Sequence, residues 1–282
     1  MRIGAHVSTA EALHLCVDRA CAIDCEAIQI FAAAPQSWRP RVHSDDALAL
    51  LQQRATACDV VPVFVHGSYL INLATADPAL LQRSLAALRQ SRRFCETSGA
   101  SGTIFHVGSH KGAGFAAVRQ QVVEALRQVL DDGGQSLLIL ENSAGTGNTL
   151  AARFAEIGAL IADVGSDRLR VCIDTCHAFA SGYDVSTPAG VDRMVEELDR
   201  EIGSERLVAV HANDSKGPFA CGKDRHENIG AGFIGLDGFR AIMAHPVFQD
   251  VPFLLEVPGF AGKGPDKENV AILKRLREEV CG

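Results

Sequence analysis

The sequence predicts an α/β fold, namely a single (β/α)8 TIM barrel with a metal site at the C-terminal ends of its strands. Eight short runs of valine, isoleucine, leucine and phenylalanine alternate with helical patterns along 282 residues, which favours a closed barrel over an open sheet. Six of these eight runs have a candidate metal ligand, a histidine, aspartate or glutamate, as their last or next-to-last residue. Because a barrel of parallel strands brings its C-terminal strand ends to one mouth, these side chains can meet there although they are far apart in sequence.

The expected strands are continuous apolar runs, as is typical of parallel strands that are buried on both faces. In chain order, we expect strands at Ile3–Val7, Ala27–Phe31, Val60–His66, Thr103–Val107, Ser136–Glu141, Leu169–Asp174, Val208–His211 and Pro252–Val257. Helical patterns lie between these runs, so the chain reads as a repeat of strand–helix units.

The helices are marked by their start and stop signals. Asp77 before Pro78 predicts an N-cap followed by proline at the first helical position, and this helix should end at Gly99. Further helices are expected from Thr187–Pro188 and over Leu236–His245. Because no linker rich in serine, proline or charge divides the chain, we expect residues 1–282 to form one domain.

The composition fits a barrel and indicates a reducing compartment. Hydrophobic residues make up 47% of the chain, which is enough for a large core. No apolar run is long enough to span a bilayer, and the opening MRIGAHVSTA lacks the basic-then-apolar order of a signal peptide. The nine cysteines are an odd number without a CxxC pair, which argues against a disulfide framework. We therefore expect a cytoplasmic protein without a membrane partner.

The net charge of −7 argues against non-specific coating of nucleic acid. The total nevertheless hides local differences, because several carboxylates would be consumed by bound metals. Two or three divalent cations would reverse the sign of the potential inside the pocket. The acidity of the chain therefore does not exclude a metal-lined site that binds phosphates.

Nine side chains are candidate metal ligands, because imidazoles and carboxylates are the groups that zinc, manganese and iron accept. They are His66, His106, Glu141, Asp174, His177, His211, Asp224, His226 and Glu256. Glu141 and Glu256 each end an apolar run, and carboxylates so buried must be paired or metal-bound. A lone histidine after a strand is more often an ordinary core residue, but His66 and His106 follow consecutive strands. Nine donors exceed the needs of one ion, so the site should hold two or three metals.

Spacing suggests how some of these ligands divide between metals. Asp174 and His177 form D-x-x-H at a strand end, where they should turn to different sides and serve two metals. Asp224 and His226 form D-x-H, the spacing of a pair that reaches one ion.

Three further residues are weaker candidates. His6 closes the first expected strand and could line the pocket. Cys172 and Cys176 flank the strand-end aspartate and could be soft zinc ligands. We nevertheless expect both cysteines to point away from that carboxylate.

The loops after the expected strands carry polar and aromatic side chains. Phe31–Val42 contains Gln36 and the only tryptophan, Trp38, and the next loop contains Tyr69. The longest loop is Asp214–Gly235, and loops of that length in a compact domain are usually functional or disordered. Its lysines, arginines and glycines favour a role facing phosphate.

Seven stretches of this sequence together resemble bacterial endonuclease IV, the zinc-dependent apurinic/apyrimidinic endonuclease also called deoxyribonuclease IV. They are GAHVS, HGSYLINLA, FHVGSHKG, ENSAGTGN, CIDTCHAFASGYD, HANDSKGPFACGKDRHENIGAG and the late LLE. The resemblance runs from Ile3 to about Pro258, and its motifs are long and specific.

The resemblance implies a barrel that holds three zinc ions, with manganese or iron as alternatives at some positions. By motif, the first ion would be held by His66, His106 and Glu141, the second by Glu141, Asp174, His211 and Glu256, and the third by His177, Asp224 and His226. It also implies a trinuclear zinc mechanism, with Glu141 as a catalytic residue, that hydrolyses the phosphodiester 5′ to abasic sites. The products would be 3′-hydroxyl and 5′-deoxyribose phosphate ends. The expected partner is double-stranded DNA with abasic sites or blocked 3′ ends, which the enzyme would trim, and we expect a monomer.

The loop after the second strand departs from the family pattern. The family often carries an arginine shortly before the loop tryptophan, and uses it to enter DNA at the lesion. Gln36 stands where that arginine is expected, whereas Tyr69 is retained in the next DNA-facing loop. The resemblance thus implies that Tyr69, Gln36 and Trp38 contact DNA. It also implies that the contact made by residue 36 differs from the one that the family's arginine makes.

Two other functions fit parts of the pattern. A single-metal sugar isomerase or epimerase on the same barrel would need only Glu141, Asp174, His211 and Glu256, and it would leave the other five candidate ligands without a use. A non-catalytic binder of damaged DNA would keep the metals as structural ions only. Carboxylate ligands suited to an open site argue against this second alternative.

Overall fold

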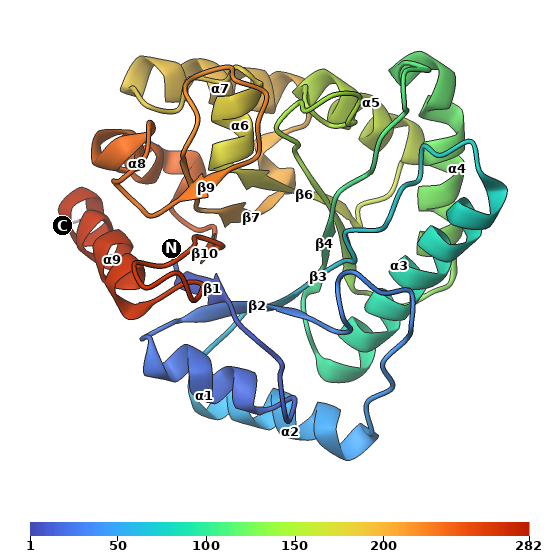
Figure 1. Ribbon diagram of the computed structural model, residues 1–282, viewed down its shortest axis with the longest axis horizontal. Coiled ribbons are helices and arrows are strands. Elements are labelled where there is room, and N and C mark those ends of the chain that lie inside the picture. Colours follow the sequence, from blue (N-terminus) through green and yellow to red (C-terminus); the bar gives the residue numbers. More distant parts are fainter. Residues whose placement is uncertain (282) are drawn as a thin grey trace.

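The computed structural model describes residues 1–281 and has a closed ring of parallel strands surrounded by helices (Figure 1). The ring order is β1, β2, β3, β4, β5, β6, β7 and β10, with β10 paired to β1. Their bounds are β1 Ile3–His6, β2 Ala27–Phe31, β3 Val63–His66, β4 Gly102–Phe105, β5 Leu137–Glu141, β6 Leu169–Asp174, β7 Leu207–His211 and β10 Phe253–Leu255. The predicted (β/α)8 barrel is confirmed.

Helices follow the strands around the outside of this ring. Their bounds are α1 Leu15–Ala22, α2 Asp45–Ala57, α3 Pro78–Ser98, α4 Phe115–Asp131, α5 Phe154–Val164, α6 Thr175–Ser181, α7 Pro188–Glu201, α8 Gly235–Ala244 and α9 Lys267–Cys281, with 3-10 turns η1 Ser204–Arg206 and η2 Pro246–Phe248. The two predicted proline starts are confirmed, because Asp77 and Thr187 cap α3 and α7 by accepting backbone N–H groups. No helix within residues 1–281 is long and apolar enough to cross a membrane.

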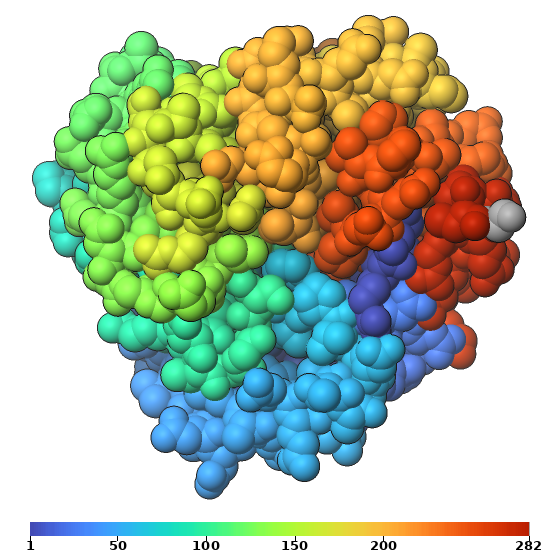
Figure 2. All heavy atoms as spheres, turned by 180° about the vertical axis from the view of Figure 1, so that it is seen from behind, coloured from blue at the N-terminus to red at the C-terminus, as the bar shows by residue number. Residues whose placement is uncertain are grey.

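Chain order runs once around the barrel, so the two ends of the chain meet. The space-filling view from behind shows the blue N-terminal segment against the orange and red C-terminal segments (Figure 2). Arg277 of α9 donates to the carbonyl oxygen of Met1 and to the Glu26 carboxylate. These contacts fasten the last helix to the strand that closes the ring.

Several strands are shorter than the apolar runs predicted, and in two of them the difference places a candidate ligand just beyond the strand end. β4 ends at Phe105 and β10 ends at Leu255, so His106 and Glu256 each follow their strand directly. β3 begins only after Pro62, which has no backbone N–H to donate to a neighbouring strand. The C-terminal strand ends stay close to the predicted positions, and these ends carry the polar side chains.

Strand alternation arranges the barrel interior in two layers. The lower layer is a cluster of buried residues from seven strands, comprising Ala27, Phe64, Ile104, Ile139, Cys172, Ala209 and Leu254. Since side chains return to the same face every second residue, the positions two further along form the next layer toward the mouth. These positions are Gln29, His66, His106, Glu141, Asp174, His211 and Glu256. A layer of apolar side chains thus lies directly below a layer of polar side chains in the barrel.

We predict that Gly4 is required for close contact between β1 and β2. A Cβ at Gly4 would lie 2.0 Å from the Ala27 carbonyl oxygen, so Gly4→Ala would push the strands apart. The free energy of unfolding should fall by about 1–3 kcal/mol, the usual cost of overpacking, as measured by denaturant titration. Ala49→Ser, on the exposed side of α2, is the control. Equal stability of both variants and the wild type would contradict this packing.

Candidate metal centre

The nine candidate ligands lie together at the mouth of the barrel. They form overlapping groups whose ligand atoms lie within 4.8 Å of one another, namely His66, His106 and Glu141; Glu141, Asp174, His211 and Glu256; Asp174, His177 and His226; and Cys176, Asp224 and His226. Glu141 belongs to the first two groups, and Asp174 joins the second to the third. The groups therefore make one continuous site.

Glu141 occupies the centre of this site and is surrounded by imidazoles. Its Oε1 lies 2.9 Å from His211 Nδ1 and 3.4 Å from His177 Nδ1. Its Oε2 lies 3.3 Å from His66 Nε2 and 3.4 Å from His106 Nε2. Burial raises the pKa of the Glu141 carboxyl, but the surrounding imidazoles outweigh burial and hold that pKa well below its ordinary value.

Three of the histidines each donate one ring N–H to a backbone carbonyl. Nδ1 lies 2.8 Å from Gly67 O in His66, 3.0 Å from Asn142 O in His177, and 3.2 Å from Glu256 O in His226. A carbonyl oxygen can only accept, so Nδ1 carries the proton in each neutral ring. The lone pair of each ring therefore lies on Nε2.

These Nε2 atoms point at carboxylates. His66 Nε2 faces Glu141, while His177 Nε2 and His226 Nε2 each lie 3.2 Å from an oxygen of Asp224. Within residues 1–281, the buried Nε2 atoms of His177 and His226 have no hydrogen-bond partner. Two acceptors that face each other repel unless a proton or a metal cation lies between them. This arrangement, with the other ring nitrogen donating to a carbonyl, fits divalent metal ligands.

The same charges shift the pKa values of the candidate ligands. Burial lowers the pKa of His226, but the carboxylates of Asp174 and Asp224 outweigh burial and raise it to about 9. Burial raises the pKa of Asp224, but the adjacent imidazoles of His177 and His226 depress it far below the ordinary value. The site thus attracts positive charge strongly, as a metal site should.

Asp174 is held in place by the start of α6. It ends β6 and caps that helix, accepting the backbone N–H of His177 at 2.8 Å. Asn213 donates to its other oxygen at 2.7 Å. The D-x-x-H spacing predicted that Asp174 and His177 face different metals. In the structure they share one group, while Asp174 also belongs to the group with Glu141.

The segment predicted as the longest loop is ordered by a short hairpin and one buried carboxylate. Strands β8 Asp214–Ser215 and β9 His226–Glu227 pair antiparallel. The carboxylate of Asp214 accepts backbone N–H groups of Ser215, Gly230, Gly232, Ile234 and Gly235. This frame fixes the turn that carries Asp224 and His226 over the barrel mouth.

Sequence reasoning missed Gln29, which is fully buried in the polar layer. Its amide nitrogen lies 2.5 Å from Glu256 Oε1, and its oxygen lies 2.9 Å from His211 Nε2. Glutamine is not a usual zinc ligand, so a search for ligand types passes over it. Gln29 lies two residues after Ala27 in β2, so it faces the barrel interior one layer nearer the mouth. This spacing could have identified it from the sequence.

Within residues 1–281, only Cys176 of the two cysteines belongs to a group of candidate ligands, although the Cys172 thiol lies beside His211. Cys172 lies in the apolar layer directly below Asp174, so the expectation that it points away from that carboxylate was wrong, because residues two apart on a strand share a face. Cys176 lies on helix α6 rather than on the strand, and its sulfur joins the group of Asp224 and His226 rather than a group of Asp174. Burial raises the pKa of the Cys176 thiol to about 12, which disfavours the thiolate form that binds metals.

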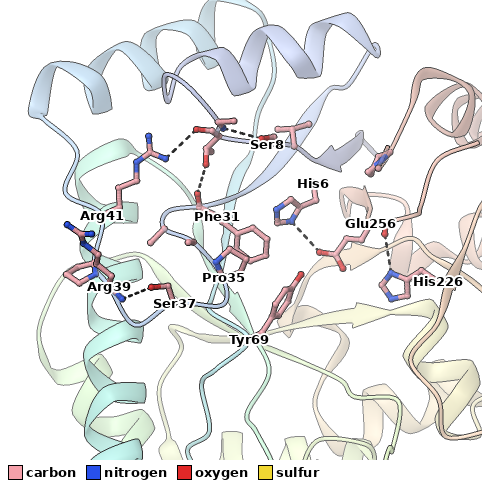
Figure 3. A pocket seen from close by; sticks show the side chains of 18 of the residues that line it. His6, Ser8, Phe31, Pro35, Ser37, Arg39, Arg41, Tyr69, His226 and Glu256 are labelled. Atoms are coloured by element: carbon pink, nitrogen blue, oxygen red, sulfur yellow. Dashed lines mark hydrogen bonds and ion pairs between the residues drawn. The ribbon is translucent and has the colours of Figure 1, made fainter. Parts of the chain in front are cut away.

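Two cavities flank the site, and Tyr69 lines both. One has a volume of about 910 Å³ and is lined by His6, Glu256 and the loop carrying Arg39 and Arg41 (Figure 3). The expectation that His6 could line the pocket is thereby met. The Tyr69 ring is half exposed beside His66, at 5.5 Å between ring centroids. Together the cavities make a continuous polar and aromatic surface around the candidate ligands.

The second cavity, of about 800 Å³, contains several cations. Its lining includes Trp38, His106, Lys111, Lys223, Asp224 and Arg225. Trp38 and Tyr69 both line this cavity. Gln36 is exposed on the same loop as Trp38, but it is not among the residues that line this cavity within residues 1–281.

Comparisons with known proteins agree with this site. Residues 17–278 match a family model described as xylose isomerase-like TIM barrel. A Halothermothrix orenii protein named probable endonuclease 4 is 39% identical over 278 residues, which cover 98% of this chain and 100% of the relative. The crystal structure of endonuclease IV from Thermus thermophilus has a TM-score of 0.87 and 33% identity, covering 99% of this chain and all of that one. A D-tagatose 3-epimerase-like protein, with a TM-score of 0.77 at 18% identity, shares the fold. The chain belongs to the endonuclease IV family.

Proposed function

We propose that this protein is a DNA repair endonuclease that hydrolyses the phosphodiester 5′ to abasic sites. Its products would be 3′-hydroxyl and 5′-deoxyribose phosphate ends, and it would also trim blocked 3′ ends. The observation that carries the proposal is the continuous set of nine ligand-type side chains at the barrel mouth, in a chain of the endonuclease IV family. Relatives named endonuclease 4 and the neighbouring endonuclease IV structure support the activity.

The donor set would hold three zinc ions, and manganese or iron would suit the same nitrogen and oxygen ligands. We assign them to His66, His106 and Glu141; to Glu141, Asp174, His211 and Glu256; and to His177, Asp224 and His226. Zinc bound there would supply Lewis-acid chemistry, activating water as a nucleophile and neutralising charge on the phosphate and the departing oxygen.

The side chains of the protein would provide geometry and binding. Glu141 is the proposed catalytic residue, because it joins two ligand groups and fixes the distance between them. The histidines that donate to carbonyls are held in one orientation, so little reorganisation is needed as charge develops.

The two cavities fit a nucleic-acid strand that crosses the site. Arg39 and Arg41 beside one cavity, and Lys111 and Lys223 beside the other, would contact phosphates despite the net charge of −7. An abasic nucleotide unstacks at low cost, so it can leave the duplex and reach the barrel mouth. Tyr69 lies where its ring could replace the missing base.

A sugar isomerase or epimerase is less well supported. It would use the group of Glu141, Asp174, His211 and Glu256 and leave no role for the ligands carried by the β8–β9 hairpin. The epimerase-like neighbour is 18% identical, so it supports the barrel fold alone.

Replacement of Glu141 by glutamine tests the assignment of the bridging ligand. Glu141→Gln should lower kcat on an abasic duplex by about 100-fold or more, the scale of losing a preorganised electrostatic group. Bound zinc should also fall, because the amide is a poorer ligand. Glu156→Gln, which changes a half-buried glutamate on α5, is the matched control. Wild-type turnover by Glu141→Gln would refute the assignment.

A second prediction concerns the residues that meet the DNA. Tyr69→Ala should weaken binding to abasic duplex about tenfold to a hundredfold, because stacking on an aromatic ring is worth roughly 1–3 kcal/mol. Gln36→Ala should cost less, and Gln36→Arg should raise affinity by adding a cation to an exposed loop. Undamaged duplex and zinc content, which should both stay unchanged, are the controls. Equal affinity of Tyr69→Ala and wild type for damaged DNA would show that other loops open the lesion.

A further inference from the structure

His211 differs from the other oriented histidines in the group that fixes its ring. His66, His177 and His226 donate to backbone carbonyls, which no substitution can remove. His211 instead contacts a side chain, because its Nε2 lies 2.9 Å from the amide oxygen of Gln29. Both side chains are fully buried.

The orientation of the Gln29 amide follows from its other neighbour. Glu256 Oε1 lies 2.5 Å from Gln29 Nε2, and a carboxylate oxygen can only accept, so the NH₂ group must face Glu256. The amide oxygen then faces His211 Nε2, which must carry a proton. The lone pair of His211 therefore lies on Nδ1, which faces Glu141 Oε1 at 2.9 Å.

The second amide hydrogen of Gln29 is also used. Nδ1 of His6 lies 3.0 Å from Gln29 Nε2 and accepts from it. The His6 ring packs against Phe31 with centroids 4.3 Å apart. Gln29 thus has its acceptor and both of its donors engaged, and two of its three partners, His211 and Glu256, lie in the polar layer.

We propose that Gln29 is a positioning residue that sets the tautomer of His211 and orients Glu256 toward the same ligand group. This role rests on the proposed function, because it assumes a metal at the group of Glu141, Asp174, His211 and Glu256. A glutamine suits the position because one planar amide accepts from an imidazole N–H while it donates to a carboxylate. Such outer contacts typically contribute tenfold to a hundredfold in metal affinity.

Two variants of the full-length chain separate the parts of this role. Gln29→Met keeps length and similar volume but removes the acceptor and the donors. Gln29→Glu keeps an acceptor for His211 but turns a second carboxylate toward Glu256. Thr103→Val is the matched control, since it removes a buried polar group of β4 that contacts Cys95 rather than a candidate ligand.

Each protein, loaded with zinc, would be titrated with a competing chelator. In Gln29→Met and Gln29→Glu, one zinc ion per chain should be released at a chelator concentration roughly tenfold to a hundredfold lower than in wild type. Thr103→Val should release zinc as wild type does. Retention of zinc by both Gln29 variants at the wild-type level would overturn the inference, and so would an equal loss in Thr103→Val.

A spectroscopic signal tests the tautomer directly. In ¹H–¹⁵N spectra of zinc-loaded protein labelled at histidine, the His211 Nε2–H resonance should persist in Gln29→Glu and shift upfield in Gln29→Met. An unchanged resonance in Gln29→Met would show that Gln29 does not hold this proton. If wild type retains no zinc, the proposed function fails together with this inference. If wild type retains zinc and the variants match it, only the inference fails.

Discussion

The candidate site depends on the register of the barrel strands. Seven apolar side chains form one interior layer, and the residues two positions further along form the polar layer above it. A slip of one residue in any strand would turn its ligand out of the barrel and an outward-facing residue in. Two contacts therefore support the site as well as the fold. β1 packs closely against β2 at Gly4, and α9 is bonded to the start of the chain.

The second constraint is electrostatic. Carboxylates buried at the mouth would be costly if they were unpaired. Glu141 and Asp174 are buried and face the Nε2 atoms of His66 and His226, whose Nδ1–H groups donate to backbone carbonyls. Backbone carbonyls and the Gln29 amide decide which ring nitrogen is left to face inward. A site built in this way favours a cation at the mouth. Under the proposed function, bound metal ions would let an acidic protein bind phosphates.

Much of this could be predicted from the sequence, because apolar runs that end in ligand-type residues reflect the same alternation that builds the layers. The helix starts at Asp77 and Thr187 could also be predicted, because each cap and its following proline are adjacent in the sequence. The role of Gln29 was not, because it depends on neighbours more than 180 residues away in sequence. Cys172 was misplaced because residues two apart on a strand share a face, and strand alternation could not place Cys176 because α6 begins at Thr175. The β8–β9 hairpin was missed because a single carboxylate organises it through backbone contacts.

The central claim is that the barrel mouth is a three-metal centre rather than a one-metal site that shares its fold. The most direct measurement is plasma emission spectroscopy of the purified full-length protein after equilibration with zinc and removal of the unbound metal. A value near three zinc ions per chain is the result that the three assigned ligand groups predict. A value of one would contradict the account and would match the single-metal isomerase alternative.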